Sequence, residues 1–174
     1  MSTSSRPGSG AGPSPRLPWG SGLRQPDRYT CGPSCVVVAR MLDDPAYAAT
    51  AGPRFADEVL ATHRRVRAWP RLLGTPPWEV ARLLPGPHRV VAARGRPGAG
   101  WDAGVPGSAL FVGSATLPRH VVLVLAPDPG TGLGDRLLYD PARGERVLRG
   151  RDDAVRSRLR LSGWDHLWAV VAPR

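Results

Sequence analysis

A glutamine, a cysteine, a histidine and an aspartate in this chain have the residue types of a thiol-dependent acyl-transfer site. They are Gln25, Cys31, His120 and Asp140. Gln25 stands six residues before Cys31, His120 begins an apolar run, and Asp140 ends a later one. If these four side chains meet in the folded chain, the sequence predicts a cysteine hydrolase.

Cys31 has the sequence context of a nucleophile. A cysteine attacks as its thiolate, whereas a free thiol with a pKa of about 8.5 is mostly protonated at neutral pH. The start of a helix at Cys31 would favour the anion, and the imidazolium of His120 would favour it further. Cys35 lies one turn deeper in an apolar stretch, where burial would raise the pKa of its thiol. We therefore interpret Cys35 as a small core residue.

Neither a disulfide nor a metal site is expected at the two cysteines. Cys31 and Cys35 are four residues apart, so on one helix their side chains lie on successive turns, which does not favour a disulfide. A zinc site needs further ligands at suitable spacing, and the sequence offers none nearby. We expect no metal, no cofactor and at least one free thiol.

His120 is the histidine best placed to act as the base, because it stands at the start of an apolar strand and could direct its ring toward a cleft. The alternative is a partly buried histidine at a strand end. His166 is the second choice, since Asp165 could polarise it, although neighbours on a strand point to opposite faces. His63 is expected on a solvated basic helix face and His88 in a turn.

Asp140 could orient the ring of His120. It ends the run 137–139 and precedes Pro141, an arrangement that is also typical of a simple turn. The Gly- and Pro-rich connection 127–134 predicts a hairpin, and antiparallel pairing would bring His120 beside Asp140. A carboxylate in that place would fix the tautomer of the imidazole and stabilise the imidazolium.

Gln25 is the candidate side-chain donor to an oxyanion. Its amide could join the backbone N–H of Cys31 in stabilising the developing negative charge, and one such donor typically contributes ~10²–10³ in rate. The alternative is an exposed polar residue in a loop. Gln25 is the only glutamine in the chain, so no other glutamine competes for this role.

Helical patterns fill the first part of the chain and strand patterns the second. We expect helices over 31–41, 56–69 and 78–84, with Thr30 and Thr75 capping the first and the third. Short β-branched runs predict strands at 89–93, 109–112, 120–125, 136–139, 146–148 and 167–171. Residues 152–159 are expected to form a small helix or turn. This order predicts an α+β domain with helices packed on one side of an antiparallel sheet.

The length of 174 residues suits one domain, which we expect at 23–174. Residues 1–22 are rich in Ser, Gly and Pro and predict a disordered leader without the apolar segment of a secretory signal. The longest apolar run is far too short to cross a bilayer. These features predict a soluble, cytoplasmic protein without a membrane partner.

The net charge of +10 and the pI of about 11.3 would suit an anionic partner. However, every basic residue is arginine, and Ala, Gly and Pro are abundant, a bias that GC-rich coding produces. The arginines are dispersed and accompany no zinc-finger, RNA-binding or basic-zipper motif. We interpret them as a solvated basic surface and do not expect a nucleic-acid partner.

The motifs together resemble papain-like cysteine peptidases, and more narrowly the bacterial double-glycine-leader peptidase group and its stand-alone relatives. In that group a segment Gln…Asp-x-x-x-Cys-Gly-Pro opens the domain, a His heads a later strand, and Asp-Pro ends the next strand. The matching positions here are Gln25, Asp27, Cys31-Gly32-Pro33, His120 and Asp140-Pro141, within a span of 23–171.

The resemblance implies a papain-like fold in which Cys31 is the nucleophile, His120 the general base and acid, Asp140 the orienting residue and Gln25 the oxyanion donor. Gly74-Thr75 also resembles a turn that precedes a substrate-side helix in the group. The chain departs from the group where Ser34-Cys35 follows the Pro and where a valine, not an aromatic residue, follows His120. The transporter and nucleotide-binding domains usually joined to leader peptidases are absent from the sequence.

Three functions remain open from the sequence. The first is a cysteine-dependent hydrolase, with peptide hydrolysis as the leading case and a peptide or acyl compound as substrate. The second is an acyltransferase on the same fold. The third is a non-catalytic module that binds a peptide or an anion through its arginines. The sequence does not indicate the cleavage specificity or the oligomeric state.

Overall fold

A single antiparallel sheet forms the centre of the molecule. The computed structural model describes residues 17–67 and 69–174, and within these ranges six strands lie in the order β1-β6-β2-β3-β4-β5. Their bounds are β1 (His88–Ala92), β2 (Ala109–Gly113), β3 (Pro118–Val124), β4 (Arg136–Asp140), β5 (Glu145–Arg149) and β6 (His166–Pro173). All six strands predicted from the sequence are present, because β-branched runs between Gly and Pro turns suit a pleated, buried surface.

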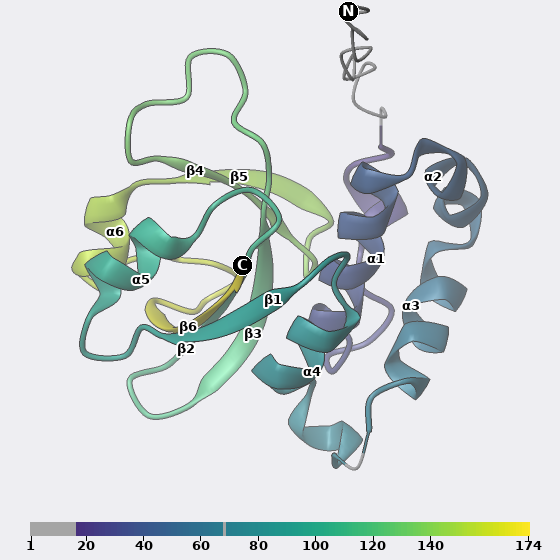
Figure 1. The fold of residues 1–174 in the computed structure, drawn as a ribbon, viewed down its shortest axis with the longest axis horizontal. Coiled ribbons are helices and arrows are strands. Elements are labelled where there is room, and N and C mark those ends of the chain that lie inside the picture. The colour runs from purple at the N-terminus through teal and green to yellow at the C-terminus, as the bar shows by residue number, and fades with distance from the viewer. Residues whose placement is uncertain (1–16, 68) are drawn as a thin grey trace, which may run out of the picture.

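Four helices gather on one side of the sheet (Figure 1). They are α1 (Cys31–Asp43), α2 (Pro45–Ala51), α3 (Phe55–Arg64) and α4 (Pro77–Leu83). A short 3₁₀ turn at Ser21–Leu23 precedes α1, and two more, at Gly52–Arg54 and Arg71–Leu73, lie between α2 and α3 and between α3 and α4. Helix α1 packs against β3, α4 packs against β1 and β6, and α3 packs on α1. The apolar side chains between α1 and the sheet form the main core, which includes Val36, Val121, Leu123 and Tyr139.

The expectation that helices cover one side only is wrong. Two short helices, α5 (Pro97–Ala103) and α6 (Arg151–Val155), lie on the other face of the sheet (Figure 1). Trp101 of α5 and Ala154 of α6 are fully buried in a second core with Leu110, Val122 and other side chains of that face. The sheet is therefore covered on both faces, and the α+β class holds with this correction.

Helix α1 forms despite three consecutive valines, which have a lower intrinsic helix propensity. Most of the helix is buried between α3 and the sheet, so tertiary packing outweighs that propensity. The helix ends at Asp44, which adopts an extended conformation and caps α2 by accepting hydrogen bonds from the N–H groups of Ala46 and Tyr47.

The two predicted threonine caps are wrong. Thr30 occupies the residue before α1, but its hydroxyl donates to the carbonyl of Asp27 at 3.1 Å and makes no cap bond to the helix. The residue before α4 is Pro76, and Thr75 lies one position further away. The first N–H groups of α1 therefore receive no side-chain cap from Thr30. Their partial positive charge is left beside Cys31, the first residue of the helix.

The N-terminal residues that the structure describes run along the β4–β5 turn. Leu17 is buried, Trp19 packs on Tyr139 with ring centroids 6.0 Å apart, and the N–H of Gly20 donates to the carbonyl of Gly144 at 2.8 Å. Residues 17–22 thus pack on the domain, although the sequence placed them in a disordered leader. Residues 1–16 of that leader lie outside the described residues. No helix within the described ranges is both long enough and apolar enough to cross a membrane.

Candidate active site

His120 and Asp140 are in direct contact. The ring Nε2 of His120 lies 2.8 Å from Oδ1 of Asp140, and both side chains are buried, at 5 % and 1 % exposure. Their strands β3 and β4 pair antiparallel, with Leu123 opposite Tyr139, as the hairpin prediction required. The start of β3 therefore lies beside the end of β4, which brings the two polar side chains together.

The two side chains occupy the face of the sheet opposite to α1. His120 alternates with Val121, and Asp140 alternates with Tyr139, whose apolar side chains both belong to the core against α1. Because His120 lies near the start of its strand, its ring still comes close to Cys31, the first residue of α1, and this cysteine raises the pKa of His120. Nε2 is engaged by Asp140, so Nδ1 is the ring nitrogen available to the Cys31 sulfur.

Two features of Cys31 place positive charge beside its sulfur, and the residue is largely buried. It is the first residue of α1, where uncapped N–H groups give the helix end a partial positive charge. It interacts with the ring of His120, whose pKa it raises. It is a free cysteine of 5 % exposure, so the sulfur lies in a largely water-excluded place where electrostatic interactions are strong.

The ring of His120 is held in its charged form. Burial lowers the pKa of His120, but the hydrogen bonds with Asp140 and Cys31 outweigh burial and raise the pKa from 6.5 to about 9. For Asp140, burial raises the pKa of the carboxyl, and the bonds from His120 and its other donors outweigh that effect and lower the pKa. The geometry therefore favours an imidazolium beside a carboxylate.

Asp140 has two further hydrogen-bond donors. The N–H of Ala142 donates to Oδ1 at 3.0 Å, and the hydroxyl of Ser162 donates to Oδ2 at 2.6 Å. The turn that follows Asp140 explains the first bond, since an aspartate commonly accepts from the N–H two residues on. Ser162 is a site residue that the sequence analysis did not identify, because no motif in the sequence connects it with Asp140.

Gln25 lies beside the same turn. Its backbone N–H donates to the carbonyl of Pro141 at 2.8 Å, which fixes Gln25 next to the residue that follows Asp140. Its side-chain Nε2 donates to the carbonyl of Asp27 at 2.7 Å, and no partner is found for the buried Oε1 among the described residues. The carbonyl of Asp27 also accepts from Thr30, so the loop that leads into α1 folds on itself.

Asp27 gives that loop its shape. Its carboxylate accepts from the N–H of Tyr29 at 2.8 Å, and the hydroxyl of Thr30 bonds its carbonyl. These contacts make a compact turn between Gln25 and Cys31. The six-residue spacing in the sequence is thus the length of a loop that folds back before the helix begins.

Cys35 is placed as the sequence predicted. It is fully buried, and its thiol lies 3.5 Å from the carbonyl of Val121. Burial raises the pKa of the Cys35 thiol well above its ordinary value, and the nearby Cys31 and Asp140 raise it further. Cys35 is therefore a poor thiolate and serves as a core residue in the helix.

The other histidines lie elsewhere. His63 is 2 % exposed, so its expected place on a solvated face is wrong; Val59 of the same helix is buried in the main core. His88 was expected in a turn, but it is the first residue of β1, and its Nδ1 lies 3.1 Å from the carbonyl oxygen of Gly86. The carboxylate of Asp165 accepts from the N–H of Arg160 at 3.0 Å, and no bond between Asp165 and His166 is found among the described residues.

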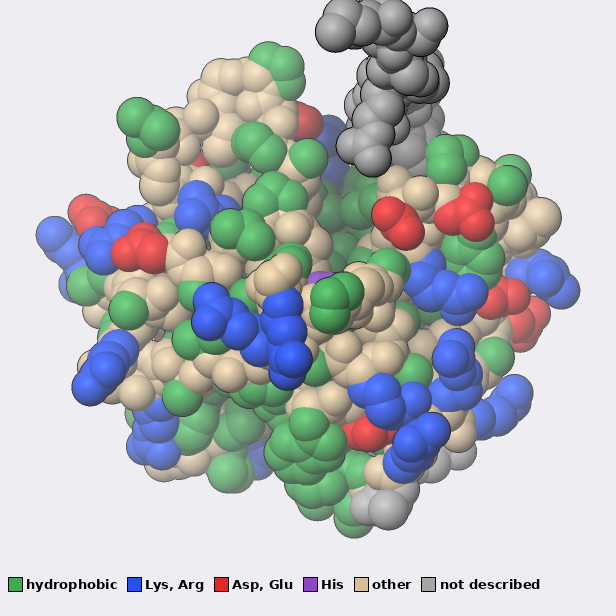
Figure 2. All heavy atoms as spheres, in the orientation of Figure 1, with side chains coloured by type: hydrophobic (Ala, Val, Ile, Leu, Met, Phe, Trp, Pro, Cys, Tyr) green, Lys and Arg blue, Asp and Glu red, His purple; other side chains and the backbone are tan. Residues whose placement is uncertain are grey.

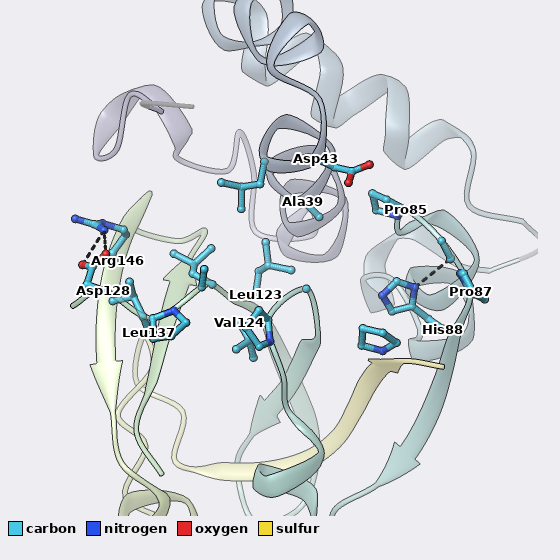
Figure 3. Close-up of a pocket in the computed structure, with 18 of the residues that line it drawn as sticks. Ala39, Asp43, Pro85, Pro87, His88, Leu123, Val124, Asp128, Leu137 and Arg146 are labelled. Carbon is cyan, nitrogen blue, oxygen red and sulfur yellow. Dashed lines mark hydrogen bonds and ion pairs between the residues drawn. The ribbon is translucent and has the colours of Figure 1, made fainter. Parts of the chain in front are cut away.

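A cavity of about 580 Å³ lies at the far end of α1 from Cys31 (Figure 3). Figure 3 shows Ala39, Leu123 and Leu137 at this cavity, with the Arg146–Asp128 ion pair at one side and His88 at another. Ala39 is eight residues beyond Cys31 on the helix, which corresponds to about 12 Å of helix length. The cavity is therefore separate from the candidate site.

The arginines form no single basic patch on the face that Figure 2 shows. Blue side chains are scattered over several parts of that face, between apolar and uncharged ones. Some arginines are paired with acidic residues of the same chain: Arg151 pairs with Asp102 at 2.8 Å, and Arg82 pairs with Glu79 at 2.7 Å. Within the described residues, no group of three or more potential metal ligands is found.

No protein-family model matches this sequence, and a search of curated proteins found no significant match. The assignment of a function therefore depends on the residues and their geometry.

Proposed function

We propose that this protein is a cysteine-dependent hydrolase with a papain-like arrangement, acting on an amide or thioester carbonyl. The observation that carries the proposal is the position of His120, which is hydrogen-bonded to Asp140 and is close enough to Cys31 for the cysteine to raise the pKa of the ring. The resemblance of the sequence motifs to papain-like peptidases supports the same roles. A peptide is the leading substrate class.

The first half of the reaction forms an acyl-enzyme. The Cys31 thiolate attacks the carbonyl carbon, and a new S–C bond forms while the carbonyl oxygen becomes an oxyanion. The backbone N–H of Cys31 and the amide of Gln25 are the proposed donors to that oxygen. The C–N bond of a peptide then breaks, and the proton of the His120 imidazolium goes to the departing amine.

The second half of the reaction releases the acyl group. The ring of His120, now neutral, takes a proton from a water molecule, whose oxygen attacks the thioester carbon. The S–C bond breaks, the Cys31 thiolate is restored, and a carboxylic acid leaves. Asp140 keeps the ring in the orientation that both proton transfers require and stabilises the charged form. Acyl transfer to an amine would follow the same steps with the amine in place of water.

The test is the trapping of the acyl-enzyme. The purified full-length chain is mixed with a p-nitrophenyl ester and with activated peptide thioesters, quenched in acid, and examined by intact-protein mass spectrometry with peptide mapping. We expect an acyl adduct on Cys31 and a burst of released p-nitrophenol. Cys31→Ala should form no adduct, whereas the matched variant Cys35→Ala should retain it.

Two results would contradict the proposal. One is an adduct distributed equally over Cys31 and other nucleophiles, which would indicate unassisted chemistry. The other is a Cys31 adduct whose rate is unchanged in His120→Gln. Either result would favour the non-catalytic binding module.

A further inference from the structure

We propose that Ser162 is a positioning residue of the candidate site, which keeps the buried Asp140 ionised and directed at His120. This inference rests on the proposed function. Ser162 lies 22 residues after Asp140, and its hydroxyl donates to Oδ2 at 2.6 Å. The other carboxylate oxygen is occupied by His120 and by the N–H of Ala142. Ser162 is thus the side chain that satisfies the oxygen facing away from the imidazole.

A buried carboxylate needs such a donor. Asp140 is 1 % exposed, so water does not solvate its charge, and an ionised carboxylate in that environment is costly unless hydrogen bonds compensate. If Asp140 became neutral, it would no longer stabilise the imidazolium. The bond from Ser162 therefore acts on Cys31 through two intermediaries, Asp140 and His120.

The backbone at Ser162 gives an independent indication. Ser162 and Gly163 are the central residues of a tight turn closed by two hydrogen bonds, Leu161 N–H to Trp164 at 2.9 Å and Trp164 N–H to Leu161 at 3.0 Å. Both central residues have positive φ, 49° and 90°. Such turns strongly prefer Asn, Asp or Gly at the first central position, because other residues are strained there.

A serine at a strained position suggests that its side chain has a role there. Glycine would fit the backbone better but could make no bond to Asp140. The turn is also held firmly, because Leu159 and Leu161 are fully buried in the second core. The turn that carries the Ser162 hydroxyl is therefore anchored in the second core, on the face of the sheet opposite to α1.

The experiment measures the rate of Cys31 alkylation by iodoacetamide against pH in the full-length protein, with adducts assigned by peptide mapping. Ser162→Gly removes the hydroxyl and relieves the backbone. Because a donor to Asp140 is lost, Asp140 should gain a proton at a higher pH, and the thiolate–imidazolium pair should be lost at a higher pH. We expect the acid limb of the rate–pH profile to move to higher pH and the alkylation rate near pH 5 to fall about three- to tenfold.

The matched control is Ser157→Gly. Ser157 also has a positive φ, of 52°, and among the described residues its hydroxyl makes no hydrogen bond to Asp140 or His120, so this variant relieves comparable strain and should leave the profile unchanged. Ser162→Asn restores a donor in a residue type that tolerates positive φ, and it should move the acid limb back toward the original position. Circular dichroism and thermal unfolding of each variant confirm that it folds.

The outcomes separate the two proposals. An acid limb in the unaltered protein that does not move in Ser162→Gly would overturn the role of Ser162 and leave the proposed function standing. An ordinary thiol titration of Cys31 in the unaltered protein would overturn the proposed function, and the role of Ser162 with it. An equal shift in Ser157→Gly would show that backbone strain, not the hydroxyl, sets the profile.

Discussion

The hydroxyl of Tyr139 donates to the carbonyl of Leu23 at 2.6 Å, across 116 residues of sequence. Tyr139 directly precedes Asp140, and Leu23 is two residues before Gln25. The bond therefore ties the strand that carries the orienting carboxylate to the loop that carries the proposed oxyanion donor. A second bond, from the N–H of Gln25 to the carbonyl of Pro141, continues the same connection.

Removing this bond should loosen the loop and leave the histidine–aspartate contact intact. Tyr139→Phe leaves the buried carbonyl of Leu23 unsatisfied, which should lower the free energy of unfolding by about 1–3 kcal/mol. Turnover should fall because Gln25 is less well placed, while alkylation of Cys31 stays normal. Urea unfolding and the two rate measurements check this. The control, Tyr47→Phe, loses a partly exposed bond to Glu58 and should change stability less.

Gln25→Ala should separate acylation from alkylation. The oxyanion forms only when a carbonyl is attacked, so loss of the amide donor should reduce kcat by ~10²–10³ with little change in KM. Alkylation by iodoacetamide passes through no oxyanion and should keep its rate. If both reactions slow equally, the role of Gln25 is the placement of the Cys31 loop and not the stabilisation of charge.

Asp140→Asn should leave His120 neutral. The carboxylate opposes the effect of burial on the ring, so without its charge the pKa of His120 should fall toward or below 6.5. The thiolate–imidazolium pair would then be lost, and kcat should drop by on the order of 10²–10⁴. Steady-state kinetics on the substrate found by acyl trapping provide the measurement. An unchanged pH profile would contradict the role of Asp140.

Gly32 is the position where a methyl group should disturb the site most directly. A Cβ at Gly32 would lie 2.9 Å from the Cβ of Thr75 and 3.2 Å from a methyl of Val80, inside ordinary contact distance. Gly32→Ala should therefore destabilise the fold by about 1–3 kcal/mol and shift the start of α1 beside Cys31. At Gly52 the nearest atom is the Met41 methyl at 3.8 Å, so Gly52→Ala is the matched control. Chemical unfolding of both variants distinguishes packing at the site from a general effect of alanine.

The strands and the His120–Asp140 contact were predictable because each depends on local signals. The apolar runs, the Gly- and Pro-rich connection between β3 and β4, and the Asp140-Pro141 ending determine which strands pair and which ends meet. Helix α2 also carried signals, since Asp44 caps it and Pro45 starts it, but the sequence analysis did not use them. Cys35 was interpreted correctly because its apolar neighbours indicate burial.

Other features depend on contacts between distant segments. Helix α5 begins with Pro97, Gly98 and Gly100, a composition typical of a loop, and it forms because Trp101 fills the second core and Gly100 lies directly against Ala93. His63 was expected in solvent because its neighbours are basic, yet it is buried. Ser162 reaches Asp140 because it lies in a turn with positive φ, and no residue pattern in the sequence predicts that contact.

The charge on His120 should also affect stability. Its folded pKa, about 9, is above its ordinary value of 6.5, so the charged ring stabilises the fold fully below about pH 6.5. This contribution is lost as the pH rises through about 9. The free energy of unfolding therefore falls as the pH rises through this range, because the folded state binds the proton more tightly than the unfolded state does.

The most direct measurement of the ion pair is the titration of the His120 ring by NMR in protein labelled with ¹⁵N-histidine, compared with Cys31→Ala. We expect a ring that stays protonated up to a pKa of about 9 and a clearly lower pKa in Cys31→Ala, because the sulfur partner is removed. A ring that titrates near 6.5 in both proteins would contradict a thiolate–imidazolium pair at this site.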